Sequence, residues 1–237
     1  MGLFDFITGG EEGQLRRHAK RMTNINAQQE DRHGSAHWLA ENGSPPAING
    51  LLGRFGVSLD SQMKDVAEKA LVFDLLVDLG PKTVEPAREW LRTHSHLAMP
   101  IRLIEHFEGQ DGAVATLLDL LARENDPFKT EKKRQILIKL AEARDPRIVP
   151  GVLLVLTDFD EGVRYAAVEA LLAQDDPGTR EPLAAHLADP EEDSNRLRTR
   201  IAGAFQQRRW SVAPHTATIL ARLPHGWQIV GDQFVPA

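Results

Sequence analysis

The pair His33 and His37 is the part of the chain whose spacing comes nearest to that of a metal site. Residues four apart share one face of a helix, so both imidazoles would point the same way, as two zinc ligands must. His94 and His96 follow in a later segment, but no third ligand is evident near the pair. The stretch 33–37 also lacks the glutamate that a metalloprotease helix carries. The sequence therefore favours surface or core histidines over a metal site.

Residue types that carry other chemistry are missing or wrongly spaced. The chain has no cysteine, which excludes a disulfide framework, a thiolate metal site and a cysteine nucleophile together. The glycines at 9–10 and 50–56 lack the lysine or the spacing of a phosphate-binding loop, and no Gly-x-Ser-x-Gly stretch is present. The sequence thus assigns no catalytic residue and no cofactor, which favours a non-catalytic role and leaves enzymatic activity open.

Positive charge is concentrated near the C-terminus, in one expected helix that an aromatic residue follows: Arg196, Arg198, Arg200, Arg208, Arg209 and Trp210. Arg196 and Arg200 lie one turn apart on the same face and offer a fork to carboxylates or phosphates. We expect a partner to bind through Arg196, Arg200, Arg208, Arg209 and Trp210. The alternative is a solvated helix whose arginines pair with the acidic residues at 191–193.

The overall charge bears on the kind of partner. A formal net charge of −6 gives no general attraction to nucleic acid or to anionic lipid. Local basic clusters at 16–21 and 129–134 could still supply one. Nucleic-acid binding is therefore kept as an alternative, and another protein is the expected partner.

A spacing of 31 residues recurs in the second half of the chain. It separates Asp145-Pro146 from Asp176-Pro177 (176 − 145), and also Asp158 from Asp189 (189 − 158). Each pair brackets an apolar run of helical period, which predicts an array of helical repeats. The same unit appears near the N-terminus, because aligning Arg32 with Arg164 also superposes apolar positions.

Capping residues followed by proline mark the turns between helices, at residues 44, 126, 145, 176 and 189. Periodicity between these marks predicts an N-terminal helix over 12–28 and six antiparallel helix pairs: 31–42 with 45–56, 62–79 with 81–94, 97–108 with 112–124, 129–143 with 146–157, 160–174 with 177–188, and 194–209 with 212–222. The predicted fold is all-α, a right-handed α-solenoid over 30–222.

Both ends depart from the repeat. Residues 1–29 form a predicted leader and capping helix, in which Leu3, Phe4, Phe6 and Ile7 either close the core or dock on a partner or a membrane surface. The last segment, 223–237, has strand-like residues around a Gly-Asp turn and predicts a small β-hairpin cap, with Trp227 and Phe234 covering the last helix pair.

The segment 160–171 carries an acidic turn, a Val-Arg pair, an alanine-rich helix and a leucine. It resembles the short HEAT-like repeat of the phycobilisome-lyase type, with weaker copies at Arg32, Lys133 and Leu197-Arg198. The resemblance covers roughly residues 30–210 and implies an architecture of stacked helix pairs.

The resemblance also implies a structural ladder between units, formed by the arginine at a helix start and the aspartate of a turn. In this chain the matching positions are Arg164 with Asp158, and Arg198 with Asp189.

Enzymes built on HEAT-like repeats were compared with the chain. Deoxyhypusine hydroxylase is recognised by repeated His-Glu dipeptides, and this chain has none. The HEAT-like DNA glycosylases use a tryptophan and an aspartate close together on one helix, but Trp38 and Trp90 have no aspartate one turn away. A lyase or isomerase accessory to a tetrapyrrole stays open from the repeat type alone.

The function predicted from the sequence is a non-catalytic scaffold or adaptor that binds another protein. The apolar runs are broken by charges well short of a membrane span, and the N-terminus lacks the pattern of a secretory signal, so a cytoplasmic location is expected. The identity of the partner, the pathway and the oligomeric state are left open.

Overall fold

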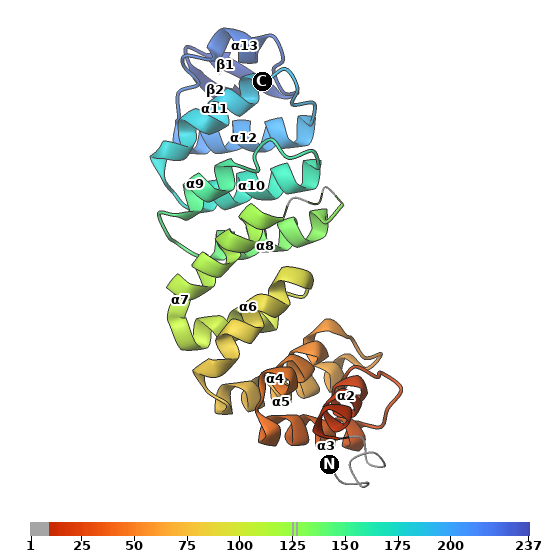
Figure 1. Cartoon of the computed structure of the whole chain (residues 1–237). Helices are drawn as coiled ribbons and strands as arrows, with labels where there is room; N and C mark the ends of the chain where they lie inside the picture. Colours follow the sequence, from red (N-terminus) through yellow and green to blue (C-terminus); the bar gives the residue numbers. More distant parts are fainter. Residues whose placement is uncertain (1–9, 125, 127) are drawn as a thin grey trace. The chain divides into compact units, whose positions relative to one another are not determined.

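The computed structural model describes residues 10–124, 126 and 128–237 (Figure 1). The apolar segment at 3–7, for which the sequence offers a plug or a docking peptide, lies outside the described residues. The described chain forms two compact units, one ending at Thr116 and the other beginning at Leu117. This division cuts the predicted array within one of its helices.

The first unit is helical throughout its described residues. Its elements are α2 (Glu11–Met22), α3 (Gln29–Asn42), α4 (Pro45–Leu52), the 3-10 turn η1 (Gly53–Gly56), α5 (Gln62–Asp78), the 3-10 turn η2 (Pro81–Thr83) and α6 (Val84–Thr93). Helix α7 (Ala98–Arg123) follows and runs past the division between the units. Gly109 interrupts α7 with a φ of 69°, a left-handed conformation that favours glycine. The helix is therefore interrupted between the two helices predicted there.

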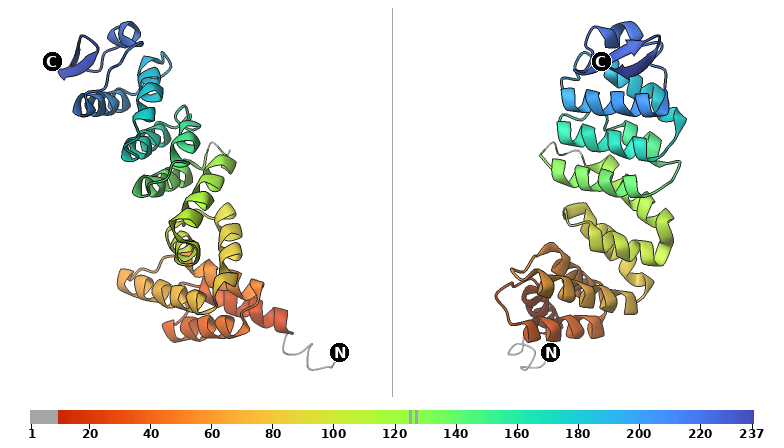
Figure 2. Two further views of the ribbon diagram at one scale, coloured as in Figure 1. Left: turned by 90° about the vertical axis from the view of Figure 1, so that its left-hand side faces the viewer. Right: turned by 180° about the vertical axis from the view of Figure 1, so that it is seen from behind.

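The second unit consists of helices and a terminal hairpin. Its elements are α8 (Thr130–Glu142), α9 (Ile148–Leu153), α10 (Glu161–Ala173), the 3-10 turn η3 (Pro177–Thr179), α11 (Arg180–Ala188), α12 (Asn195–Arg208), α13 (Thr216–Leu220), β1 (Trp227–Val230) and β2 (Gln233–Pro236). Helices α8, α10 and α12 lie side by side in one layer (Figures 1 and 2), and α9 and α11 pack against α10 and α12 respectively. The predicted all-α repeat fold with a C-terminal β-hairpin is confirmed.

Helix α10 shows why the repeats stack. Its buried residues Val163, Ala166, Ala167, Ala170 and Leu171 follow the i, i+3, i+4, i+7 spacing of a single apolar stripe. Three of them are alanines, which allow the neighbouring helix α8 to approach closely. One helix pair alone cannot cover this stripe, so each pair depends on the next.

The turn aspartates satisfy backbone amides in the way that the sequence predicts. Asp145, Asp176 and Asp189 each accept a hydrogen bond from the amide two residues further on, at 2.9, 2.7 and 2.9 Å. Ser44 does not behave as predicted, because its hydroxyl donates to Asn42 and makes no cap to α4.

Helix α13 is shorter than predicted, for a reason that the hairpin supplies. The amide of Val212 donates to the carbonyl of Asp232 at 2.8 Å, and Ser211 forms a bridge with Gln233. Residues just after α12 are therefore bonded to the edge of the hairpin, and the last helix begins only at Thr216.

The hairpin covers α12. Strands β1 and β2 pair antiparallel, with Ile229 opposite Phe234. Phe234 is 2% exposed, and its ring packs edge-on against Phe205 of α12 and against Trp227, with centroids 6.3 and 6.0 Å apart. These aromatic contacts close the apolar end of the second unit.

The contribution of this aromatic cluster can be measured. We expect Phe234→Ala to lower the free energy of unfolding by about 3 kcal/mol, because it leaves a cavity against Phe205. Val230→Ala is the matched control in the same hairpin, since Val230 is 64% exposed and should cost little. The measurement is urea unfolding together with hydrogen exchange of the α12 amides. Equal effects of the two substitutions would show that the hairpin does not cover α12.

Candidate functional site

The fourth residue of four helices is a cation that lies buried or nearly buried. These residues are Arg32 in α3, Lys133 in α8, Arg164 in α10 and Arg198 in α12. Arg32, Lys133 and Arg198 are 4%, 7% and 5% exposed, and the Arg164 side chain is 12% exposed. A cation so far from water needs a carboxylate or several carbonyl acceptors.

Arg32 joins α3 to α5 in the first unit. Its Nε and Nη2 donate to the two carboxylate oxygens of Glu68 at 2.9 and 2.6 Å, and its Nη1 donates to the carbonyl of Ala27. Arg54 also donates to Glu68, at 3.1 Å, and to Asp65 at 2.8 Å. Burial acts to raise the pKa of Glu68, but the two guanidinium groups outweigh it and the pKa lies below its ordinary value.

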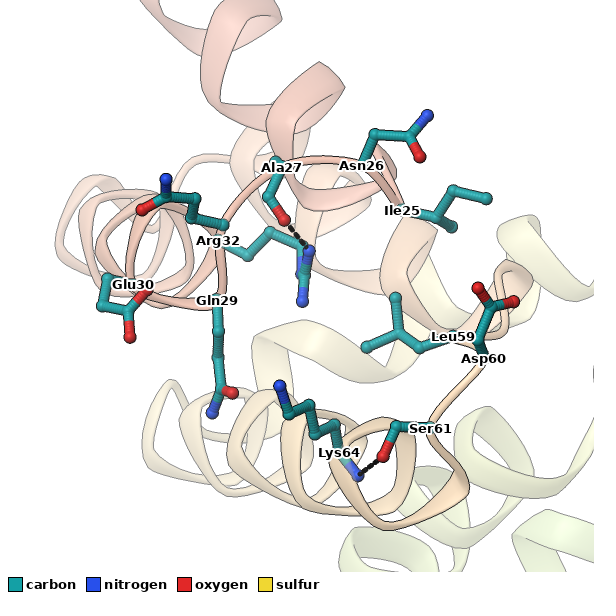
Figure 3. A pocket seen from close by; sticks show the side chains of 11 residues that line it. Ile25, Asn26, Ala27, Gln29, Glu30, Arg32, Leu59, Asp60, Ser61 and Lys64 are labelled. Carbon is teal, nitrogen blue, oxygen red and sulfur yellow. Dashed lines mark hydrogen bonds between the residues drawn. The ribbon is translucent and has the colours of Figure 1, made fainter.

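A hollow of about 400 Å³ opens over Arg32 (Figure 3). It is bounded by the turn before α3 and by the turn before α5, and Lys64 and Ser61 line its lower side in that view. The guanidinium of Arg32 forms part of the wall, but its donors are already directed at Ala27 and Glu68.

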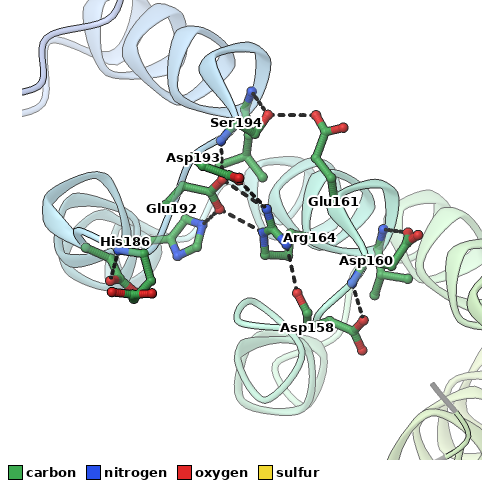
Figure 4. Close-up of polar contacts among 12 residues, drawn as sticks. Asp158, Asp160, Glu161, Arg164, His186, Glu192, Asp193 and Ser194 are labelled. Carbon is green, nitrogen blue, oxygen red and sulfur yellow. Dashed lines mark hydrogen bonds and ion pairs between the residues drawn. The ribbon is translucent and has the colours of Figure 1, made fainter.

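Arg164 makes the same kind of contact in the second unit (Figure 4). Its Nε and Nη2 donate to the carboxylate of Glu192 at 2.8 and 3.1 Å, and its Nη1 donates to the carbonyls of Asp158 and Phe159 at 2.9 and 3.1 Å. The amide of Ser194 also donates to Glu192, at 2.8 Å. One guanidinium therefore ties the turn before α10 to the turn before α12.

A second hollow, of about 360 Å³, lies over Arg164 in the place that corresponds to the hollow over Arg32. The acidic residues that line it are Asp158, Asp189, Glu191, Glu192 and Asp193. His186 also lines it, with Nε2 lying 2.9 Å from the Glu192 carboxylate but outside hydrogen-bond geometry. Burial lowers the pKa of His186, although the nearby Glu192 carboxylate acts in the opposite direction.

The ladder predicted from Asp158 and Arg164 takes a different form in the structure. Arg164 contacts the carbonyl of Asp158, while the carboxylate of Asp158 binds Lys133 Nζ at 2.8 Å. The carboxylate partner of Arg164 is Glu192, which the sequence offered only as a partner for the arginines of α12. Glu192 lies in the turn before α12, two residues before Ser194, which caps that helix.

Arg198 and Asp189, the second expected pair, do not bind each other through hydrogen bonds. The Asp189 carboxylate accepts from the amide of Glu191, and its carbonyl accepts from Arg222 Nη1 at 3.3 Å. The Arg198 Nε and Nη2 atoms are buried and have no hydrogen-bond partner.

The arginines predicted to bind a partner are used unequally by the fold. Arg200 donates to both carboxylate oxygens of Glu169, at 2.5 and 3.0 Å. Arg208 donates to the carbonyl of Leu172 at 2.8 Å and to Asp175 at 3.2 Å. Both arginines thus tie α12 to α10 and its C-terminal end, where the alternative interpretation expected pairing with the turn at 191–193. Replacing them would disturb the fold as well as any docking surface.

For the other three residues of that predicted surface, the contacts described are ring contacts and exposed positions. Arg196 is exposed and places its guanidinium 3.9 Å from the centre of the Tyr165 ring. Arg209 is exposed and ends α12 in a left-handed conformation, with φ 53°. Trp210 packs edge-on against Phe205, and the Arg208 guanidinium lies over its ring.

A groove of about 350 Å³ lies on the layer of α8, α10 and α12. It is lined by Arg134, Ile138, Ala141, Gly162, Tyr165, Ala166, Glu169 and Arg196. The floor is aliphatic and aromatic, and the rim is charged. Ile138 is 53% exposed and shares this lining with Ala141 and Tyr165, so the groove presents apolar surface to solvent. Among the described residues of the second unit, this groove combines an apolar floor with a few polar groups, as ligand-binding recesses commonly do.

The two histidines of the pair differ in exposure. His33 is partly buried, with no hydrogen-bond partner for Nε2, and His37 is exposed. Within the described residues, no three His, Cys, Asp or Glu side chains come together as a metal site would require.

The helices that carry this groove and the cations of the second unit match a known repeat family. Residues 114–203 match the family model described as HEAT repeats. The matched segment includes Lys133, Arg164 and Arg198 and all the lining of the groove. The match is to HEAT repeats in general, so the phycobilisome-lyase subtype stays a prediction from the sequence.

No curated protein and no solved structure matches the chain. Of the helices in the described ranges, none is both long enough and apolar enough to cross a membrane.

The joint at Arg164 yields a stability prediction. Arg164→Met should lower the free energy of unfolding by about 3 kcal/mol, because it leaves the Glu192 carboxylate buried without its cation. The double variant Arg164→Met, Glu192→Leu should recover most of that loss, since an apolar pair replaces an ion pair at little cost. Arg123→Met is the control, because Arg123 belongs to an exposed pair with Asp119. Thermal and urea unfolding of all four proteins would test this, and a double variant no better than Arg164→Met would contradict it.

The same joint predicts a pH dependence. The folded-state pKa values of His186 and Glu192 both lie below the ordinary values of 6.5 and 4.5, so the unfolded chain takes up these protons more readily. Stability should therefore fall as pH falls below about 6.5 through His186, and fall further below about 4.5 through Glu192.

The histidine part of this loss can be isolated by substitution. Between pH 7.5 and 5.5, His186→Gln should lose less melting temperature than the natural protein. His225→Gln, at an exposed histidine, should behave like the natural protein. Identical pH profiles for His186→Gln and the natural protein would contradict the assignment.

Proposed function

We propose that this protein is a non-catalytic adaptor that binds another protein through the groove on α8, α10 and α12. HEAT repeats commonly serve as scaffolds for protein interaction, and such arrays present long surfaces to a partner. The observation that carries the proposal is the groove around Tyr165. Its aliphatic floor is open to solvent, while positively charged groups stand on its rim.

The lining of the groove indicates the chemistry of the occupant. Ile138 and Ala141 of α8 and Ala166 of α10 form the apolar floor, which fits one aliphatic or aromatic side chain of a partner. Arg134 has a side chain that is 48% exposed, and Arg196 projects over Tyr165. These two cations favour acidic residues on either side of the inserted side chain.

The local sequence makes this recess. Gly162 lies in the first turn of α10, and a Cβ at that position would lie 3.2 Å from the Arg134 Cδ. The glycine therefore leaves room for the Arg134 side chain to cross the gap between α8 and α10. Arg200 holds Glu169 at the far edge of the groove through a bidentate pair. Arg196, by contrast, makes only a ring contact and can turn toward a ligand.

The arginines of α12 differ in whether they bind neighbouring helices, and this difference changes the docking surface expected from the sequence. Arg196 is retained as a partner-binding residue, and Arg134 and Ile138 are added to it. Arg200 and Arg208 support the surface by tying α12 to its neighbours. Arg209 and Trp210 lie at the end of α12 and are placed at the margin of the proposed surface.

The test uses one substitution in the groove and one outside it. Ile138→Asp should abolish capture of the partner from the native cell, because it places a negative charge on the apolar floor and next to the expected acidic residues. Leu154→Asp is the matched control, since Leu154 is 75% exposed at the end of α9 and does not line the groove. Both side chains are exposed, so both variants should keep the melting temperature of the natural protein within a few degrees.

The measurement is affinity capture followed by quantitative mass spectrometry. A protein retained by the natural chain and by Leu154→Asp, and lost with Ile138→Asp, would support the proposal. Equal capture by all three would place the docking surface elsewhere. A pigment that copurifies with visible absorbance, or a salt-sensitive gel shift with nucleic acid, would contradict the adaptor role and favour the tetrapyrrole or the nucleic-acid alternative.

A further inference from the structure

The buried cation of α12 differs from the three that correspond to it. Arg32 binds Glu68, Lys133 binds Asp158, and Arg164 binds Glu192, in each case through a carboxylate beyond its own helix. Arg198 occupies the same fourth position and is 5% exposed, yet its Nε and Nη2 atoms have no hydrogen-bond partner. It is the only buried arginine with unpartnered side-chain nitrogens among the described residues.

In the described part of the chain no carboxylate is hydrogen-bonded at this position, and residues 209–226, which follow α12, contain arginines and no acidic residue. Arg222 approaches instead, and its Nη1 donates to the carbonyls of Asp189 and Pro190. These are carbonyls of the turn before α12, as Asp158 and Phe159 are of the turn before α10. Glu192, the acid that influences Arg198, already binds Arg164 bidentately.

Two guanidinium groups therefore influence each other at this end of the second unit with no carboxylate hydrogen-bonded to either in the described residues. Burial lowers the pKa of Arg198, and Arg222 lowers it further, while Glu192 acts in the opposite direction. Buried guanidinium donors are normally satisfied, so Arg198 is a position where an acceptor from outside the protein chain could bind.

We propose that Arg198 and Arg222 form an anion site that takes a carboxylate, the side chain of an aspartate or glutamate on a bound protein. The chemistry is that of Arg164, whose guanidinium receives a glutamate from the next turn in two parallel hydrogen bonds. Arg222 is exposed and can move to admit the ligand, whereas Arg198 is held within the fold.

This proposal rests on the adaptor function and adds a second contact for the bound protein. It can be disproved without disproving binding at the groove. Arg196 lines the groove, and Arg198, two residues further along the helix, lies on the opposite side of α12. A loss of binding at Arg198 should therefore leave the groove intact.

The first experiment observes the arginine Nε–H resonances of ¹⁵N-labelled full-length protein by NMR. The probes are an N-acetylated, C-amidated peptide Ala-Ala-Glu-Ala-Ala, the same peptide with glutamine in place of glutamate, and sodium acetate, each against sodium chloride at equal ionic strength. The Arg198 signal is assigned by its loss in Arg198→Met. We expect a saturable shift of that signal with the glutamate peptide, and none of the Arg164 signal, which Glu192 already occupies.

The arms of this experiment separate the sources of the carboxylate. A shift with the glutamate peptide that exceeds the one with acetate, and is absent with the glutamine peptide, supports a protein side chain as the ligand. Arg222→Gln should then weaken the peptide affinity by about tenfold, through loss of the second cation. An equal response to acetate and peptide would overturn the protein partner and indicate a site for small free anions. No shift with either probe would overturn the site.

A second measurement avoids dependence on a ligand. Arg164→Met should lower the melting temperature, because it strands a buried carboxylate. Arg198→Met should leave the melting temperature unchanged or raise it, because it removes a buried cation to which no carboxylate of the described residues is hydrogen-bonded. A fall of similar size in both variants would show that Arg198 already has a partner within the chain, and would overturn the proposal.

Discussion

The arrangement of the repeats depends on the need to neutralise a buried cation with a carboxylate from a later part of the chain, a helix for Arg32 and a turn for Arg164. Removing a guanidinium from water costs several kcal/mol, and only well-placed acceptors offset that cost. Arg32 and Arg164 each find carbonyls in the turn before their own helix and a carboxylate beyond the next helix of the pair. A single side chain thus fixes the separation of two turns. The apolar stripes alone would permit sliding, so these polar joints set the register within each unit.

The turn aspartates have a separate task, which explains why the family ladder is altered here. Asp145, Asp176 and Asp189 use a carboxylate oxygen to accept a backbone amide two residues on, and this fixes each turn locally. The contacts that connect one turn with another are made by other acidic residues. Asp158 serves one joint with its carboxylate, which binds Lys133, and the next with its carbonyl, which binds Arg164. Through its carboxylate and its carbonyl, Asp158 therefore connects the start of α8 with the start of α10.

Much of this could be read from the sequence, because its determinants are local. Apolar period, turn aspartates and a 31-residue spacing define where most helices begin and end, and Gly109 breaks α7 close to the predicted place. The acids Glu68 and Glu192 could not be paired with their arginines in advance. They follow Arg32 and Arg164 by 36 and 28 residues, so no single period relates them. The use of Arg200 and Arg208 within the fold was likewise hidden, since helix periodicity gives their face but not the acids and carbonyls of the neighbouring helix.

The surface that a partner can bind depends on which side chains already make contacts within the fold. Contacts inside the fold and contacts with acidic ligands use the same chemistry, in which a guanidinium binds a carboxylate. The number of arginines in α12 therefore overstates how many can bind a partner. Arg200 is bonded to Glu169, whereas the Arg196 guanidinium lies over the ring of Tyr165. At Arg198 the described residues supply no carboxylate that is hydrogen-bonded to Nε or Nη2. The kind of contact that joins the earlier helices is therefore incomplete at this position, which is why we propose that a carboxylate of another protein completes it.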